Sequence, residues 1–164
     1  MSTKQGIVAM VVLGLWISAA NAVDLNTDAL KKMQQEGHKI VEEQGALLTL
    51  RLANGNCLAA AGKPGQVGAN LVVQKCDDNA SAQKWQFDQQ GRLVSHGGTC
   101  VGIAGNASKH GSNAQLQECA GNPQQKWSHD KQGRLAGHKG LCLQATGGNV
   151  MAANCGKSPS QKWR

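Results

Sequence analysis

The sequence predicts an all-β protein with the architecture of a β-trefoil, and three observations predict it. The triplet Gln-Lys-Trp occurs at residues 83–85, 125–127 and 161–163. Two cysteines precede each triplet at similar distances. Short apolar stretches, such as Leu47 to Leu52 and Leu141 to Leu143, are separated by Gly and Asn, with no sustained helical period.

The three repeats share an internal spacing. Each begins with a Leu, followed by a Gly five residues later and a Cys two residues after that. A second Cys has a Gly eight and an Asn six residues before it, and the Trp lies eight or nine residues after it. Units this small cannot bury their own apolar faces, so they must share one core around a pseudo-threefold axis. We place the repeats at about 46–88, 89–130 and 131–164.

The first 22 residues have the pattern of a secretory signal peptide. Lys4 precedes an apolar run from Ile7 to Ile17, and small residues end at Ala22 in a cleavage site of the A-x-A kind. We expect cleavage after Ala22 and a secreted or periplasmic mature chain that begins at Val23. The run is too short for a spanning helix, so we expect no transmembrane segment in the mature chain.

Residues 23–45 precede the repeats and predict a short amphipathic helix. Leu30, Met33, Ile40 and Val41 lie on one helical stripe, with charged residues elsewhere. Gly45 can end the helix. Two roles remain open for this segment: a helix that packs on the domain or acts as a spacer, and a helix that docks a partner protein.

Six cysteines in an exported chain predict three disulfides, for which 15 pairings exist in principle. The triplicate favours pairing within each repeat, and each such loop constrains the unfolded chain by about 3 kcal/mol in the entropy model. The sequence has no Cys-x-x-Cys and no His pair at ligand spacing, so we expect neither a metal site nor a cofactor. The favoured disulfides are Cys57–Cys76, Cys100–Cys119 and Cys142–Cys155.

Over residues 46–164 the repeats resemble the ricin B-type lectin domain. The resemblance rests on three Cys pairs and three Gln-x-Trp motifs in register. We expect each Trp to point at the common axis and to bury about 150–250 Å². We expect each motif Gln to satisfy backbone groups at a buried hairpin. The residues interpreted as structural are Gln83, Trp85, Gln125, Trp127, Gln161 and Trp163.

The resemblance implies carbohydrate binding in a shallow pocket of each repeat. In the family, an Asp two residues after the first Cys accepts hydrogen bonds from sugar hydroxyls. An aromatic residue is common two residues before the second Cys, and a polar residue, often Asn, precedes Gln-x-Trp. In repeat order, this chain has Ala59, Gly102 and Gln144 at the first position, Gln74, Gln117 and Ala153 at the second, and Ala82, Gln124 and Ser160 at the third.

The sugar-reading positions have therefore diverged, and the middle repeat is the best candidate pocket. Gln115, four residues before Cys119, keeps a Gln of the family pattern. We predict that Gln115 and Gln124 form hydrogen bonds with the sugar, that Asn113 orients the hairpin, and that His110 lies at the rim. The full candidate set is Gln115, Gln117, Gln124, His110, Asn113 and Gln144.

Aromatic residues are too few to provide a stacking platform. The chain has no Tyr, one Phe and four Trp, and Trp16 lies in the predicted signal peptide. Phe87 is two residues beyond Trp85, where strand alternation places it on the core side. The lectin fold is therefore better supported than lectin activity, because a fold alone does not determine function.

Charge suggests the kind of ligand. The whole chain has a formal charge of +7, and from Gly45 onward 13 Lys and Arg stand against 5 Asp and Glu. Residues 23–44 have 3 Lys against 5 acidic residues. A basic domain attracts anionic partners, such as acidic glycans or an acidic protein surface. We expect no nucleic acid, because aromatic residues are not interleaved with the basic ones.

We do not expect an enzyme, since no pair of carboxylates in the repeats has a recognisable acid/base context. Two hypotheses remain. The first is a carbohydrate-binding module with degenerate sugar sites, for which acidic glycans are candidate ligands. The alternative is a protein-interaction or assembly subunit, of the kind found in some bacterial multi-component toxins, which docks through residues 23–45 or the basic face of the trefoil.

Overall fold

The computed structural model describes residues 27–43, 46–105 and 109–164, and the side chains of residues 37–43 are not part of this description. Within these ranges the chain forms one α-helix, ten β-strands and four short 3₁₀ turns. The predicted signal peptide and its cleavage site lie outside the described residues. The helix and turns are α1 (Thr27–Glu43), η1 (Ser81–Gln83), η2 (Pro123–Gln125), η3 (His138–Gly140) and η4 (Pro159–Gln161).

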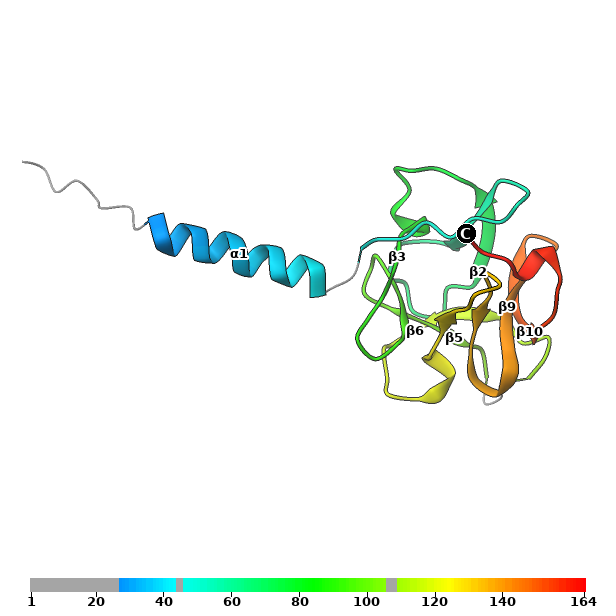
Figure 1. Cartoon of the computed structure of the whole chain (residues 1–164). Coiled ribbons are helices and arrows are strands. Elements are labelled where there is room, and N and C mark those ends of the chain that lie inside the picture. The colour runs from blue at the N-terminus through cyan, green and yellow to red at the C-terminus, as the bar shows by residue number, and fades with distance from the viewer. Residues whose placement is uncertain (1–26, 44–45, 106–108) are drawn as a thin grey trace, which may run out of the picture.

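The strands are short and all of their pairings are antiparallel. They form a six-stranded sheet in the order β1-β2-β10-β9-β8-β7 and a four-stranded sheet in the order β3-β4-β5-β6. Both sheets curl around a common centre (Figure 1). The strands are β1 (Asn56–Ala60), β2 (Leu71–Lys75), β3 (Trp85–Phe87), β4 (Leu93–Ser95), β5 (Cys100–Ile103), β6 (Ala114–Gln117), β7 (Ser128–His129), β8 (Leu135–Ala136), β9 (Leu141–Thr146) and β10 (Asn149–Asn154).

One predicted strand differs from the structure. Leu141 to Leu143 lies in β9, but Leu47 to Leu52 makes only isolated bridges, from Leu48 to Trp85 and from Arg51 to Cys57. Arg51 also exchanges both of its backbone hydrogen bonds with Arg164. The partner changes within a few residues, so no single strand runs beside this stretch long enough to form a ladder.

Three hairpins close a ring around the pseudo-threefold axis. At each junction, an Asn of one repeat pairs with a residue of the next repeat. The Asn lies six residues before the second Cys of its own repeat, and its partner lies four residues before the second Cys of the next. The third repeat contacts the first in the same way, so the ring is cyclic. This closure confirms the β-trefoil. The three pairs are Asn70 with Gln115, Asn113 with Met151, and Asn149 with Val72.

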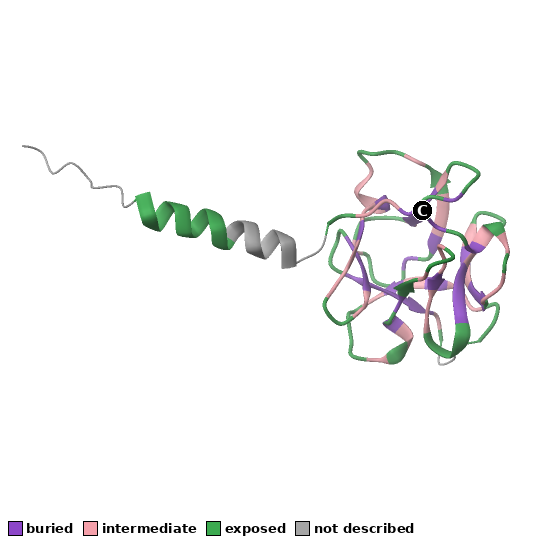
Figure 2. Cartoon of the chain, in the orientation of Figure 1, coloured by how far each residue is buried: buried purple, intermediate pink, exposed green. Residues whose placement is uncertain are grey.

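The core lies inside this ring and contains all three motif tryptophans. Trp85 and Trp163 are fully buried, and Trp127 is 5 % exposed. Phe87 is partly buried and packs against the same cluster. Most buried residues lie on the strands, and most exposed residues lie in the loops that connect them (Figure 2). The aromatic surface of the described residues is therefore mostly turned inward.

Each tryptophan also makes one buried hydrogen bond that fixes its orientation. The indole Nε1–H donates to the carbonyl of the residue directly after the first Cys of the same repeat, so it joins the end of the repeat to its beginning. An indole N–H buried without a partner would be costly, which makes this pairing part of the core. The bonds are Trp85 to Leu58 at 3.0 Å, Trp127 to Val101 at 2.9 Å and Trp163 to Leu143 at 3.0 Å.

The three disulfides are confirmed, and each joins the two cysteines of one repeat. Their Cα atoms are 5.0 Å apart in all three. The sequence separation is 19 residues for Cys57–Cys76 and Cys100–Cys119, but 13 for Cys142–Cys155. The third hairpin is therefore six residues shorter than the other two.

The helix α1 is confirmed and is drawn apart from the strands (Figure 1). Residues 27–36 are all exposed, with Leu30 at 49 % and Met33 at 70 %. Neither of these two side chains packs on the trefoil, while Ile40 and Val41 lie among the side chains that are not described. Across the described ranges, no helix has the length and apolar character needed to cross a membrane.

Candidate functional site

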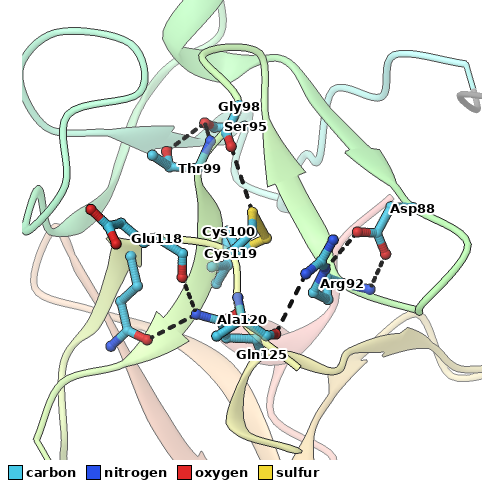
Figure 3. Close-up of a disulfide and its surroundings, with 12 residues drawn as sticks. Asp88, Arg92, Ser95, Gly98, Thr99, Cys100, Glu118, Cys119, Ala120 and Gln125 are labelled. Carbon is cyan, nitrogen blue, oxygen red and sulfur yellow. Dashed lines mark hydrogen bonds and ion pairs between the residues drawn. A yellow bond between two sulfur atoms is a disulfide. The ribbon is translucent and has the colours of Figure 1, made fainter. Parts of the chain in front are cut away.

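The motif Gln of each repeat holds the backbone on both sides of the second Cys. In the middle repeat, Gln125 Oε1 accepts a hydrogen bond from Ala120 N–H at 2.7 Å, and its Nε2 donates to Glu118 O at 2.8 Å (Figure 3). These side chains are at most 2 % exposed. The equivalent bonds link Gln83 to Asp77 N and Lys75 O, both at 2.9 Å, and Gln161 to Gly156 N at 2.8 Å and Asn154 O at 2.9 Å.

Strand register builds an outward face beside this Gln in the middle repeat. Gly102 in β5 lies directly opposite Gln115 in β6. Residues opposite each other in an antiparallel pair share a face, and so does Gln117, two positions along the strand. Val101 and Leu116 point to the other side and are fully buried. Gly102, Gln115 and Gln117 therefore form one surface, which we call the middle face.

The same register builds an equivalent face in the other two repeats, but with less polar side chains. On the first face, only Gln74 is polar, and it is exposed. On the third face, only Gln144 is polar. The first face consists of Ala59, Val72 and Gln74, and the third consists of Gln144, Met151 and Ala153. The middle face is thus the only one of these three with two carboxamides.

Gln117 fills the space above Gly102. Its Nε2 donates to Ile103 O at 3.0 Å, and its Oε1 accepts from Gln125 Nε2 at 3.3 Å. A Cβ atom at position 102 would overlap the Gln117 carboxamide, so this arrangement requires Gly there. The resemblance places an Asp side chain at position 102. In this chain, the polar group comes from the opposite strand instead.

Gln144 makes the corresponding contact in the third repeat from a different strand. Its Oε1 accepts from Gln161 Nε2 at 2.8 Å, and its Nε2 donates to Thr146 Oγ1 at 3.3 Å. In two repeats, therefore, a second carboxamide bonds to the motif Gln. Gln117 and Gln144 both have internal partners and are held in defined orientations.

Gln115 and Gln124 differ from those two residues because their side chains remain available. Both are half-buried, and neither side chain makes a hydrogen bond within the described part of the chain. Gln115 lies on the middle face, and Gln124 precedes the motif Gln125 in η2. Each carboxamide keeps both donors and an acceptor for a ligand.

The other two candidates occupy different places. Asn113 Oδ1 accepts from Asn149 Nδ2 at 2.7 Å, so its side chain links two repeats rather than lying on the middle face. His110 is exposed in the loop before Gly111. The structure therefore brings together Gln115, Gln117 and the motif Gln125, with Asn113 and His110 outside this group.

A repeated ion pair, which we did not predict from the sequence, holds the same backbone segments. Asp88 Oδ2 lies 2.6 Å from Arg92 Nε, and the equivalent pair Asp130–Arg134 lies at 2.7 Å. Arg92 Nη1 also donates to Ala120 O at 3.5 Å (Figure 3), as Arg134 Nη1 does to Gly156 O at 3.2 Å. The signal was the shared pattern Asp-x-Gln-Gly-Arg at residues 88–92 and 130–134.

These pairs lower the pKa of both aspartates. Burial raises the pKa of Asp88, but hydrogen bonds from the backbone and side chain of Arg92, together with its charge, outweigh burial and hold the pKa below its usual value. The same balance with Arg134 lowers the pKa of Asp130. Elsewhere, the residues described here contain no group of three or more His, Cys, Asp and Glu that could hold a metal ion.

Comparison with known proteins identifies relatives of this architecture. Residues 45–163 match the family model described as the ricin-type beta-trefoil lectin domain. A relative, polypeptide N-acetylgalactosaminyltransferase 11 from Xenopus tropicalis, is 31 % identical over 134 residues, which cover 79 % of this chain and 22 % of that protein. The chain thus spans about a fifth of the length of this relative.

Solved structures agree on the fold. The agglutinin from Abrus precatorius superposes with a TM-score of 0.66 at 21 % identity, covering 74 % of this chain and 48 % of the agglutinin. The β-trefoil lectin of the Vibrio vulnificus hemolysin/cytolysin, solved with N-acetyl-D-lactosamine bound, superposes with a TM-score of 0.61 at 22 % identity. The match covers 73 % of this chain and 93 % of the lectin. The designed threefold-symmetric protein ThreeFoil superposes with a TM-score of 0.63 at 21 % identity, and the match covers 72 % of this chain and 96 % of ThreeFoil.

The two Asp–Arg pairs predict a loss of stability in acid. Because folding lowers both pKa values, the pairs stabilise the protein above the unfolded-state pKa of about 3.9, and this contribution is lost as the pH falls through the folded-state values. We expect the urea midpoint to fall as the pH drops below about 4, with a shallower fall in the Asp88→Asn/Asp130→Asn double variant. An equally steep fall in that variant would assign the acid sensitivity to other groups.

Proposed function

The chain belongs to the ricin-type β-trefoil lectin family, and from this premise we propose that it binds carbohydrate through the middle face. The observation that carries the proposal is the Gln115 carboxamide, which makes no side-chain hydrogen bond to the residues that the structure describes, beside the fixed carboxamide of Gln117. Sugar hydroxyls both donate and accept hydrogen bonds, and a carboxamide does the same. Gln124, next to the motif Gln125 in η2, is the second residue that we propose as a sugar contact.

In this proposal, Gln117 is a positioning residue and Gln115 is the residue that contacts the sugar. Gln117 is held by Gln125 and Ile103, so little side-chain freedom remains to be lost when a ligand binds against it. Gln115 and Gln124 adapt to the hydroxyl pattern of the ligand. Gln144, which has an analogous internal bond to Gln161, supplies a single polar group to the third face, so we assign that face a lesser role.

The expected affinity is weak. The Trp and Phe residues of the repeats are three buried tryptophans and the partly buried Phe87, and the repeats have no Tyr, so no large aromatic ring is exposed for the apolar face of a sugar to stack on. Hydrogen bonds to exposed hydroxyls compete with water and contribute about 1 kcal/mol each. A dissociation constant near 1 mM for a single site is the scale that we expect.

We further propose that the preferred glycans are acidic and are met outside the cytoplasm. From Gly45 onward, the chain has 13 Lys and Arg but only 5 Asp and Glu. Two of these acidic residues, Asp88 and Asp130, are already paired with arginines. The remaining positive charge favours anionic ligands. Three disulfides suit an oxidising compartment, which supports export by the predicted signal peptide. The proposed role is binding rather than catalysis.

Substitution of Gln115 tests the middle face. Gln115→Ala removes about one hydrogen bond to the sugar, so we expect glycan affinity to fall about five-fold. The measurement is a glycan array followed by titration of the strongest hit at low and high salt, because an acidic ligand held by charge binds less tightly at high salt.

The control for this test is Gln74→Ala, which makes the same chemical change on the first face. We expect it to bind as the wild type does. An array without a hit above background would contradict the proposal, and so would a Gln115→Ala variant with unchanged affinity.

A second candidate function is docking to a partner protein through α1. The observation that favours it is the exposure of two large apolar side chains on one stripe of this helix, Leu30 at 49 % and Met33 at 70 %. Amphipathic helices commonly bind other proteins by placing exposed apolar residues at helical spacing into a hydrophobic groove. In this case the trefoil is a stable scaffold, and the basic face adds a second contact.

Affinity capture from the source periplasm or culture medium tests this second function. The mature protein should recover one partner in a stoichiometric amount, and the Leu30→Gln/Met33→Gln variant should lose it because the apolar contact is removed. Gln35→Ala, on the other side of the helix, is the control. Equal recovery by a protein that lacks residues 23–44 would exclude docking through α1.

A further inference from the structure

The segment that ends the third repeat carries more positive charge than its equivalents in the other two repeats. In this segment, the Trp163 side chain is buried in the core, and the backbone at Lys162 is extended. Successive side chains of an extended segment point to opposite sides, so Lys162 and Arg164 share the outward side. Both are exposed. The equivalent pairs are Lys84 and Gln86 in the first repeat, and Lys126 and Ser128 in the second.

Two further arginines lie directly beside these residues, one on each side. Arg51 N–H donates to Arg164 O at 2.7 Å, and Arg164 N–H donates to Arg51 O at 2.8 Å. On the other side, Arg134 forms a β-bridge with Lys162. Residues directly opposite each other in an antiparallel pair share a face. The four side chains therefore lie on one surface, which we call the basic strip: Arg51, Arg134, Lys162 and Arg164.

The basic strip lies on the outside of the trefoil. Leu50 and Leu52, on either side of Arg51 in the sequence, are 2 % and 4 % exposed and belong to the core. Leu135, which follows Arg134, is fully buried in the same cluster. Because neighbouring side chains alternate, the arginines point away from the core. Arg51 is exposed, and Arg134 is half-buried.

The corresponding sets of the other two repeats contain fewer cations. Lys84 Nζ donates to Thr49 Oγ1 at 3.0 Å, which marks the outward side of the first set. The first set has one cation, the second has two and the third, the basic strip, has four. The first set is Lys84, Gln86, Thr49 and Val94, and the second is Lys126, Ser128, Arg92 and Ala136.

The charges of the basic strip are not required by the fold. Like charges directly opposite each other in a sheet are destabilising, and the strip has two such pairs, Arg51–Arg164 and Arg134–Lys162. Only Arg134 has an ion-pair partner within the described ranges, Asp130 at 2.7 Å. The equivalent positions of the other repeats hold neutral residues without loss of the barrel. A bound anion would relieve this repulsion.

The chemistry of the strip favours phosphate groups. Directly opposed residues of this kind are about 5.5 Å apart at Cα, and residues two positions apart along a strand are about 6.7 Å apart. The ligand must therefore present several negative charges within about 10 Å. Three of the four cations are arginines, whose planar guanidinium groups bind phosphate oxygens with two parallel hydrogen bonds.

An exposed leucine borders the strip and favours a membrane over a soluble polyanion. Leu48 pairs with Trp85 and packs on the core, so Leu47 and Thr49 point to the same outward side as Arg51. Leu47 is 51 % exposed. At a membrane surface, cations meet the headgroups while an apolar side chain enters the boundary with the acyl chains. A soluble polyanion offers no apolar region to this leucine.

We propose that the basic strip docks the trefoil on a membrane that contains anionic phospholipids. Arg51 and Arg164 bind headgroup phosphates, Lys162 adds positive charge, and Leu47 enters the interface. The strip is built from segments of the first and third repeats, whereas the middle face belongs to the β5–β6 hairpin. The inference therefore goes beyond the proposed sugar binding and does not depend on it.

Co-sedimentation of the mature protein with vesicles tests this proposal. The vesicles consist of phosphatidylcholine alone or of phosphatidylcholine mixed with phosphatidylglycerol. We expect binding to the mixed vesicles only, and weaker binding at high salt. Lys162→Gln/Arg164→Gln should weaken binding about thirty-fold, which corresponds to about 1 kcal/mol for each removed charge. Leu47→Gln should weaken it about five-fold, because the apolar contact is lost.

Urea unfolding separates this loss of binding from a loss of folding. Because Lys162→Gln/Arg164→Gln removes both like-charge pairs, we expect this variant to be at least as stable as the wild type. The matched control is Lys63→Gln/Lys126→Gln, which removes the same net charge from two exposed positions outside the strip. It should bind the mixed vesicles as the wild type does.

Four outcomes would overturn the proposal. The first is no binding of the wild type to the mixed vesicles, and the second is an equal loss in the control, which would assign binding to net charge alone. The third is binding lost in Leu30→Gln/Met33→Gln but kept in Lys162→Gln/Arg164→Gln, which would assign the contact to α1. The fourth is binding to dextran sulfate but not to vesicles, which would assign the strip to a soluble polyanion.

Discussion

The structure depends on one arrangement that occurs in all three repeats. The motif Trp donates its indole proton to the carbonyl that follows the first Cys, and the motif Gln bonds to the backbone on both sides of the second Cys. The disulfide joins the same two segments. Each repeat is thus closed at one place by a covalent bond, a buried amide and a buried indole. Because none of these groups can be removed without leaving another unpaired, the three positions are fixed.

This requirement limits where function can lie. The buried tryptophans and glutamines serve the fold, so binding must use residues that differ between repeats. The middle face has Gln115 opposite Gly102, with the Gln117 carboxamide over this glycine, while its equivalents are mainly apolar. Departures from threefold symmetry, more than the symmetry itself, are therefore the features to which we assign ligands.

Sequence spacing was sufficient to predict the β-trefoil and the disulfides, because identical offsets in three repeats require equivalent positions in space. It was not sufficient for the site. Comparison of each sequence position with the family pattern indicated that position 102 has no side chain to bind a sugar, because it is Gly. In the structure, strand register brings the Gln117 carboxamide over Gly102. The predicted strand at residues 47–52 failed because its partners change along its length.

Hydrogen exchange of the three buried indole protons tests this account most directly. If Trp85, Trp127 and Trp163 close one shared core, their Nε1 protons exchange only when the whole domain unfolds, with the same free energy of opening within about 1 kcal/mol. That value should equal the free energy of global unfolding from urea titration. An indole that exchanges through an opening several kcal/mol below the global value would show that its repeat opens independently, and would contradict the shared core.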